Sequence, residues 1–435
     1  MSWILQVVFV AVVAVPIYFL VRRIKQIRGN ILLGKDTDRS DQSGDRWKAM
    51  FLIAFGQKKM FKKPVPAFLH LLIYVGFLVI NLEVLEFMID GLMGTHRIFA
   101  PYLGSFYNLA MNFFEFLALG VLISCVAFLI RRNVMKVSRF TKPEMKGWPT
   151  LDGNLILIIE CILMLAILKM NAADQILQTR GVSGYVDTGN LMISSLFIPL
   201  LQNFSDGLLV IVERGAWWFH IVGIFAFAVY VTYSKHLHIF LAFPNTYYSN
   251  LEPKGKIQNM DAVTTEVKSM LGMPVEGSSE PPAEVGTFGA KDATDLSWKS
   301  LMESYSCTEC GRCTAECPAN QTGKLLSPRK VMMDTRDRIE DIGAGKGEGK
   351  TLLGDFITKE EINACTSCNA CTEACPINID PLSIILEMKR YVAMEESGSP
   401  ASWNSMFFNI ETNFAPWKFS PTDRFNWAQD LNDKN

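Results

Sequence analysis

The stretch Cys307-Thr-Glu-Cys310-Gly-Arg-Cys313-Thr-Ala-Glu-Cys317-Pro318 recurs with the same spacing as Cys365-Thr-Ser-Cys368-Asn-Ala-Cys371-Thr-Glu-Ala-Cys375-Pro376. Each string reads C-x2-C-x2-C-x3-C-P, the run found in ferredoxins with two [4Fe-4S] clusters. Three thiolates spaced by two residues can surround one corner of a cubane, and the fourth, followed by proline, leaves toward the other cluster. The spacing therefore predicts two ligand sets, which are Cys307, Cys310, Cys313 and Cys375, and Cys365, Cys368, Cys371 and Cys317.

Zinc sites and disulfides are the competing interpretations of these cysteines. Zinc usually takes ligands in two separated pairs, and disulfide scaffolds are short secreted chains, whereas this chain has 435 residues. The segment between the two strings has helical patterns at 327–342 and 358–363, which favours an all-helical ferredoxin domain. The other two cysteines, Cys125 and Cys161, lie in apolar stretches, where we expect them to pack without a further role.

Most of the apolar residues lie upstream, within roughly the first 245 residues. A helix needs about 20 apolar residues to cross the hydrocarbon core of a bilayer. Five stretches meet this need, at 3–20, 66–89, 106–130, 153–170 and 216–233. The stretch 191–212 is also apolar, but Pro199, Asn203, Ser205 and Asp206 interrupt it, so we expect a helix along the outer membrane surface instead of a sixth span.

The loop charges predict the orientation of these spans. Residues 22–65 contain twelve Lys and Arg and residues 131–150 contain six, whereas the two alternate loops together contain three. The positive-inside rule then places the N-terminus outside and all residues after Tyr233 in the cytoplasm. No basic residues precede the first span and no cleavage site follows it, so we expect a retained anchor and not a signal peptide.

Two of the five histidines are predicted at matching depth on the cytoplasmic side of the membrane. His70 lies near the start of the second span and His238 at the end of the fifth. Histidines in membrane spans are functional candidates, and a haem between two helices needs one imidazole from each, although a packed, hydrogen-bonded histidine is the alternative. On a continuous helix His220 would lie about 27 Å from His238 and point the same way, near the outer start of the fifth span. His236 would then point away by nearly half a turn.

A resemblance to a known family is visible in these histidine segments. Trp218-Phe-His220-Ile-Val-Gly and Tyr233-Ser-Lys-His-Leu-His238-Ile-Phe resemble the last span of the nitrate reductase gamma subunit, a di-haem cytochrome b of five helices. Ala67-Phe-Leu-His70 resembles its second span, which implies that His70 and His238 hold the haem b nearest the cytoplasm. The family's second histidine on that span falls at Ile80, so the outer haem would need His96 from the loop as the partner of His220.

The order of the parts is similar to that of membrane-bound iron–sulfur oxidoreductases related to heterodisulfide reductase. The similarity extends through Cys317-Pro-Ala-Asn-Gln-Thr-Gly-Lys-Leu-Leu-Ser-Pro-Arg and Asn409-Ile-Glu-Thr-Asn-Phe-Ala-Pro-Trp417. Some members are electron-transfer-flavoprotein:menaquinone oxidoreductases, which implies electron transfer between a cytoplasmic partner and menaquinone, in either direction. Such proteins usually continue into cysteine-rich CCG domains, so we expect a separate CCG-domain subunit, or electron-transfer flavoprotein, to dock on the aromatic tail.

The sequence thus predicts an all-α protein in four parts. These are a five-helix transmembrane cytochrome b bundle at 1–245, a linker at 246–298, a cytoplasmic α-helical ferredoxin domain at 299–395 and an aromatic docking tail at 396–435. The net charge of −1 argues against nucleic-acid binding. Glu83, Glu86 and Glu115 lie in predicted spans and are candidates for a proton path to quinone, or else structural carboxylates. A membrane redox sensor is the alternative function, and it would not need the pair of His70 and His238.

Overall fold

The protein is helical throughout the part that the computed structural model describes, residues 3–274 and 287–429. Within those residues the β pairing amounts to two isolated bridges, Lys35 with Ser297 and Leu353 with Ile357. Five of the described helices are long and apolar enough to cross a membrane. They are α1 (Trp3–Ile31), α3 (Pro64–Met93), α5 (Ser105–Leu129), α6 (Trp148–Thr179) and α8 (Asp206–Val231). The predicted all-α class with five long apolar helices in the N-terminal half is confirmed.

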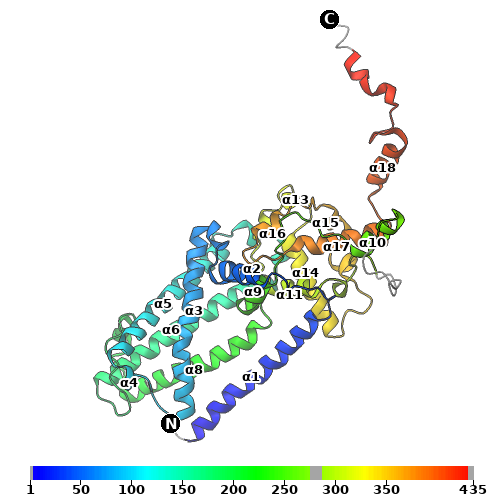
Figure 1. The fold of residues 1–435 in the computed structure, drawn as a ribbon. Helices are drawn as coiled ribbons and strands as arrows, with labels where there is room; N and C mark the ends of the chain where they lie inside the picture. The colour runs from blue at the N-terminus through cyan, green and yellow to red at the C-terminus, as the bar shows by residue number, and fades with distance from the viewer. Residues whose placement is uncertain (1–2, 275–286, 430–435) are drawn as a thin grey trace.

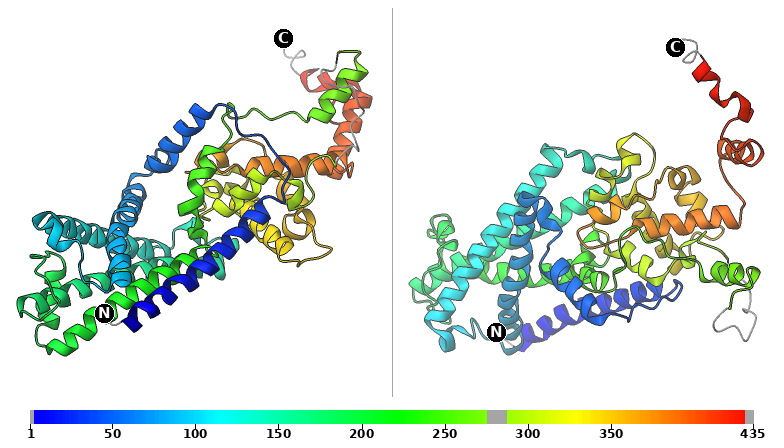
Figure 2. Two further views of the ribbon diagram at one scale, coloured as in Figure 1. Left: turned by 60° about the horizontal axis from the view of Figure 1, so that its bottom comes forward. Right: turned by 45° about the horizontal axis from the view of Figure 1, so that its top comes forward.

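Helices α3, α5, α6 and α8 form a bundle, and α1 packs against it along part of its length (Figure 1). Phe9 of α1 is fully buried, and its ring centroid lies 5.7 Å from that of Trp217 on α8. A Cβ atom at Gly91 of α3 would come within 2.3 Å of the Phe9 ring, so this approach requires glycine. From this contact α1 continues to the C-terminal half, where it packs against α11 and α14 (Figure 2).

The C-terminal half is built from short helices around one apolar core. They are α11 (Trp298–Ser306), α12 (Arg312–Ala315), α13 (Pro318–Gln321), α14 (Pro328–Gly343), α15 (Lys359–Asn363), α16 (Ala370–Ala374) and α17 (Pro381–Met394). The Ser327 hydroxyl accepts from the Lys330 N–H and caps α14, and Thr358 caps α15 in the same way. The helices predicted at 327–342 and 358–363 are therefore present. We call this half the cysteine domain.

The cysteine domain lies at one end of the bundle, next to the start of α3 and the end of α8 (Figure 1). A bidentate ion pair links the cysteine domain to α1, in which Arg23 donates to both carboxylate oxygens of Glu340 on α14, at 3.0 and 2.8 Å. Asn30 of α1 adds a 2.9 Å hydrogen bond to the Tyr305 hydroxyl. The opposite end of the bundle, which carries α4 (Ala100–Leu103), is called the far end below.

The surface helix expected at 191–212 is wrong as a single element. The chain there forms η6 (Ser194–Phe197) and α7 (Ile198–Leu201), and residues from Asp206 onward already belong to α8. Ser205 accepts a hydrogen bond from the Leu208 N–H, so a polar residue that seemed to interrupt the stretch is the N-cap of the fifth long helix. Consequently His220 lies near the middle of that helix and not at its start.

The other elements are short connections and the tail. They are α2 (Ser43–Met50), η1 (Phe51–Phe55), η2 (Met60–Lys62), η3 (Ile130–Val134), η4 (Ser138–Phe140), η5 (Pro143–Met145), η7 (Lys235–Leu237), α9 (His238–Tyr247), α10 (Asp261–Met270), η8 (Ala293–Asp295), η9 (Leu352–Phe356), α18 (Ala401–Asn413) and η10 (Pro421–Ala428). Most of the Gly- and Pro-rich part of the predicted linker, residues 275–286, lies outside the described residues. Helix α18 and η10 extend away from the body (Figure 1).

Candidate functional site

The cysteines of the two strings meet across α12 and α16, the two short helices that contain the third cysteine of each string, Cys313 and Cys371. Cys307, Cys310 and Cys313 line one cavity together with Cys375, which comes from the other string. Cys365 lies close enough to Cys317 and Cys368 for their charges to interact. The structure therefore brings together the cysteines that the spacing assigns to each set, with the fourth cysteine exchanged between strings. The cavity lined by the first set is called the cysteine cavity below.

The backbone around the cysteines is arranged to donate hydrogen bonds to sulfur. The N–H groups of Glu309 and Ser367 donate to Cys307 Sγ and Cys365 Sγ, each at 3.4 Å. Both residues have a left-handed backbone, with φ of 54° and 56°, which turns the N–H toward the preceding cysteine. Burial raises the pKa of Cys307 to about 12, so a metal is needed to keep it as a thiolate. These features fit the thiolate ligands of iron–sulfur clusters.

One cysteine of the second set is exposed, although Cys317 and Cys371 of that set are buried. Cys307 is buried against α11 and α14, and the cysteine cavity faces the end of the bundle through Arg312 and Arg329. Cys368, of the second set, is exposed to solvent. One set therefore lies beside the bundle, and the other reaches the surface of the cysteine domain.

His70 and His238 form a pair at the same end of the bundle. Their ring centroids are 6.4 Å apart, and two imidazoles that bind one metal ion at about 2 Å per bond have centroids about 6 Å apart. His70 Nδ1 is 3.1 Å from the Gln57 side-chain oxygen, and His238 Nδ1 is 3.2 Å from the Lys235 carbonyl. Hydrogen bonds of this kind orient a histidine and leave Nε2 for a metal. The pair thus fits the ligation of one metal ion.

The continuous helix assumed between His220 and His238 is wrong, because α8 ends at Val231. Asp152 of α6 explains the break, since its carboxylate accepts from the Ser234 hydroxyl at 2.6 Å and from the Lys235 N–H at 3.2 Å. The chain restarts at η7, and His238 is the first residue of α9. His236 does not point away from His238 as expected, because the two ring centroids are 5.3 Å apart.

A buried ion pair connects the histidine segment to the first cysteine string. Lys235 binds the carboxylate of Glu309, which lies between Cys307 and Cys310, and Arg336 binds the other oxygen of that carboxylate at 2.9 Å. Burial alone would raise the pKa of Glu309, but the charges of Lys235 and Arg336 hold it below its usual range. This contact fixes the histidine pair against the cysteine cavity.

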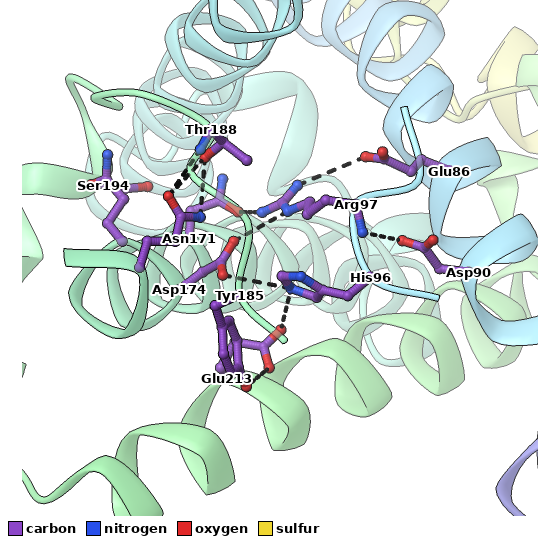
Figure 3. A network of polar contacts seen from close by, with 12 residues as sticks. Glu86, Asp90, His96, Arg97, Asn171, Asp174, Tyr185, Thr188, Ser194 and Glu213 are labelled. Atoms are coloured by element: carbon purple, nitrogen blue, oxygen red, sulfur yellow. Dashed lines mark hydrogen bonds and ion pairs between the residues drawn. The ribbon is translucent and has the colours of Figure 1, made fainter. Parts of the chain in front are cut away.

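A second polar network lies at the far end of the bundle, with Arg97 at its centre (Figure 3). The buried Arg97 guanidinium donates to Glu83 at 3.1 Å, to Asp174 at 3.2 Å and to the Asn171 side-chain oxygen. Its backbone N–H donates to Asp90 at 2.8 Å. The network ties the loop after α3 to α3 and α6.

Glu86 and Glu115 belong to the same network. Glu86 accepts from the Tyr107 hydroxyl at 2.6 Å, and that hydroxyl is also 3.3 Å from Arg97 Nη1. Glu115 accepts from Asn171 at 3.1 Å and from backbone N–H groups at the start of η6. All three glutamates named from the sequence are thus buried together. Asn171 and Asp174 were missed as site residues because the fourth span was expected to end at 170, whereas α6 continues to Thr179. Arg97 was considered only as a loop charge, because its buried partners lie on other helices.

His96 and His220 have different partners. His96 Nε2 lies 3.5 Å from Asp174 and 3.7 Å from Glu213, and its ring is 5.0 Å from that of Tyr185 (Figure 3). His220 is buried against Phe87 and the Leu163 carbonyl, and its Nδ1 has no hydrogen-bond partner in the part of the chain that the structure describes. The second haem on these two histidines stays a prediction.

Comparison with known families identifies the C-terminal site. Residues 303–379, which contain both cysteine strings, match the model of the 4Fe-4S dicluster domain. The chain contains a dicluster domain. This match supports [4Fe-4S] clusters as the cofactors. The cysteine domain is called the dicluster domain from here on.

Similarity to curated proteins extends over the whole chain. The probable iron–sulfur-binding oxidoreductase FadF of Bacillus subtilis is 27% identical over 98% of this chain and 61% of its own length. The EtfAB:quinone oxidoreductase of Syntrophomonas wolfei is 27% identical over 99% of this chain and 60% of its own length. One component of the dihydromethanophenazine:CoB–CoM heterodisulfide reductase of Methanosarcina mazei is 26% identical over 32% of this chain and 36% of its own length.

These comparisons confirm the resemblance to iron–sulfur oxidoreductases, and they support an electron-transfer oxidoreductase role. The chain spans about three fifths of the length of the first two relatives. No solved structure matches the chain.

Proposed function

We propose that this chain is a quinone-linked membrane electron-transfer subunit, which passes electrons between a cytoplasmic redox partner and menaquinone. Cys307, Cys310, Cys313 and Cys375 would hold one [4Fe-4S] cluster, Cys365, Cys368, Cys371 and Cys317 the other, and His70 and His238 one haem b. When bound, these groups supply reversible one-electron chemistry. The observation that carries the proposal is the histidine pair, joined through Lys235 and Glu309 to the cysteine cavity.

The two ends of the dicluster domain are suited to electron exchange with different partners. The set that includes Cys368 reaches the surface, where a water-soluble partner has access, whereas the cysteine cavity adjoins the bundle. Arg312, which lines the cavity, is close enough to His70 for their charges to interact. The cysteine cavity thus lies beside the histidine pair.

The proposed partner is a CCG-domain subunit or electron-transfer flavoprotein, the latter suggested by the name of the Syntrophomonas relative. Exposed aromatic side chains on α18 and η10 are its proposed docking site, since interfaces are enriched in such residues. They include Trp403, Phe407, Phe408, Phe414, Trp417, Phe425 and Trp427. We propose the bacterial inner membrane as the location, with the dicluster domain in the cytoplasm and the far end outside, following the loop charges.

Glu83, Glu86 and Glu115 are the proposed proton route for the quinone reaction. Arg97, Tyr107 and Asn171 connect their carboxylates into one hydrogen-bonded network, which could relay protons along the far end. A redox-sensing role is the second candidate function, and the observation that disfavours it is the orientation of both His70 and His238 by Nδ1 hydrogen bonds.

The test is the cofactor content of the purified full chain. We expect about eight irons in clusters per chain and a b-type absorption band. His70→Ala should abolish that band, whereas His236→Ala, a change at a neighbouring buried histidine, should keep it. Zinc in place of iron, or an unchanged haem spectrum in His70→Ala, would contradict the assignment, and a chain with clusters but no haem would favour the sensor.

A further inference from the structure

A cavity of about 200 Å³ runs through the bundle between α3, α5, α6 and α8. A single water needs about 10–15 Å³ on this measure, so the space is far larger than a packing defect. Along α3 the cavity extends from Ile73 to Val84, and along α8 from His220 to Val231. Its length suits an elongated ligand.

The cavity is apolar apart from a few side chains. His220 lines it with a buried Nδ1 that has no hydrogen-bond partner among the described residues. A buried polar atom without a partner costs free energy, which a ligand with a matching group would recover. Ile80 faces the same space from α3, and Glu160 contributes the other ionisable group in its wall. The other ring nitrogen of His220 donates to the Leu163 carbonyl, so Nδ1 is the acceptor nitrogen of the neutral imidazole. A ligand here would be apolar and carry a hydrogen-bond donor for Nδ1.

One end of the cavity lies next to the pair of His70 and His238, and the other end contains His220. Ile73 follows His70 by three residues on α3 and Ile239 follows His238 directly, so one end adjoins the histidine pair. Ile80 lies ten residues from His70, about 15 Å along the helix, so the His220 end is separate from that pair. Two lining residues, Asn81 and Phe240, are exposed on the side of the bundle. In a membrane such an opening admits a ligand from the bilayer.

We propose that this cavity is the quinone-binding site, with a hydroxyl group of the reduced quinol donating a hydrogen bond to His220 Nδ1 and the isoprenoid tail leaving past Asn81. An apolar ring that carries two hydroxyl donors in its reduced form, with an apolar tail, matches the lining and the opening. The quinone takes up two electrons from the reduced cytoplasmic partner through this chain and two protons from water, and it leaves as quinol. The inference rests on the proposed quinone-linked function.

The test uses menadione, a tailless naphthoquinone, with the full-length chain in detergent. Ile80→Phe fills the cavity, and Leu82→Phe places the same ring two residues away, at a position that is 58% exposed on the outside of α3. We expect Ile80→Phe to raise the menadione concentration for half-maximal fluorescence quenching about tenfold, as overpacking does. Leu82→Phe should change it less than about twofold, as surface substitutions do.

His220 provides a second pair of variants if Ile80→Phe does not fold. His220→Leu removes the Nδ1 acceptor and should weaken binding of menadiol, the reduced form of menadione, about tenfold, whereas His220→Gln keeps an acceptor oxygen and should recover part of the loss. Unchanged binding in both Ile80→Phe and His220→Leu, while the wild type still binds and is oxidised by menadione, would overturn the site and leave the proposed function standing.

Two other outcomes are distinguishable. Failure of menadione to oxidise the reduced wild type would contradict the proposed function itself, and the quinone site with it. Two haems per chain in a pyridine haemochrome assay, with one lost in His220→Leu, would show that haem and not quinone occupies the cavity. One haem per chain, retained in His220→Leu, is the result that the proposal requires.

Discussion

Replacing Arg97 by leucine tests whether the far-end network holds the bundle together. Arg97 is buried, and its guanidinium lies within hydrogen-bond distance of Glu83, Asp174, Asn171 and Tyr107. The leucine variant would remove the cation that is paired with three buried carboxylates, those of Glu83, Glu86 and Asp174. We therefore expect a large loss of stability, together with loosening of the loop that carries α4.

The magnitude follows from burial. Removing one partner of a buried ion pair costs about 3–5 kcal/mol, because the remaining charge stays desolvated. Arg180 offers a matched control at the same end, since its pair with Asp206 is largely exposed, with side-chain exposures of 32% and 55%. Breaking an exposed pair costs about 0–1 kcal/mol. Arg97→Leu should therefore lower the free energy of unfolding several-fold more than Arg180→Leu does.

The assay is unfolding of the purified chain in mixed detergent micelles by rising SDS content, followed by tryptophan fluorescence. The double variant Arg97→Leu with Asp174→Asn should recover part of the loss, because it removes one of the unpaired charges. Equal unfolding midpoints for Arg97→Leu and Arg180→Leu would refute the reasoning and would mean that water reaches the network in the folded protein.

Three further changes test other contacts. Cys375→Ser should remove the iron bound with the first cysteine string, whereas Cys125→Ser should leave iron content unchanged, as measured by iron analysis and low-temperature EPR. Burial alone would raise the pKa of Glu144, but its hydrogen bond to Arg329 holds it below its usual range, so its stabilisation is present above about pH 4.5 and lost as pH falls through the lowered value. The difference in Tm between wild type and Glu144→Gln should accordingly be largest at pH 7 and disappear in acid, and a difference that grows in acid would contradict the ion pair. Arg23→Ala breaks the ion pair between α1 and α14 and should increase amide hydrogen exchange at the end of α1, with the rest of the bundle unchanged.

Local sequence signals predicted much of this fold. The two cysteine strings carry their spacing in the sequence, and the caps Ser327 and Thr358 mark the starts of α14 and α15. Long apolar runs gave the number of spans, because the composition that crosses a bilayer is a property of each segment alone. The pairing of His70 with His238 was likewise found from their predicted depth.

Features that depend on distant partners could not be found in this way. The break after α8 results from Asp152, which comes from another helix and satisfies the freed backbone and hydroxyl groups. The continuous-helix assumption therefore misplaced His236, whose ring lies beside His238. At the far end, Asn171 and Asp174 seemed to be loop residues because polar side chains lower the mean hydropathy of a segment. In the structure both lie on α6 and accept hydrogen bonds from Arg97.

The most direct test of the account is the oxidation of the reduced chain by quinone. The purified full chain is reduced with dithionite, freed of excess reductant and mixed with menadione in a stopped-flow spectrometer that records haem and cluster absorbance. The account predicts that haem and clusters are both oxidised in the wild type, and that cluster oxidation in His70→Ala slows strongly because the connection to the bundle is lost. Clusters that are oxidised equally fast in both proteins, or that stay reduced in the wild type, would contradict the proposed route between the dicluster domain and quinone.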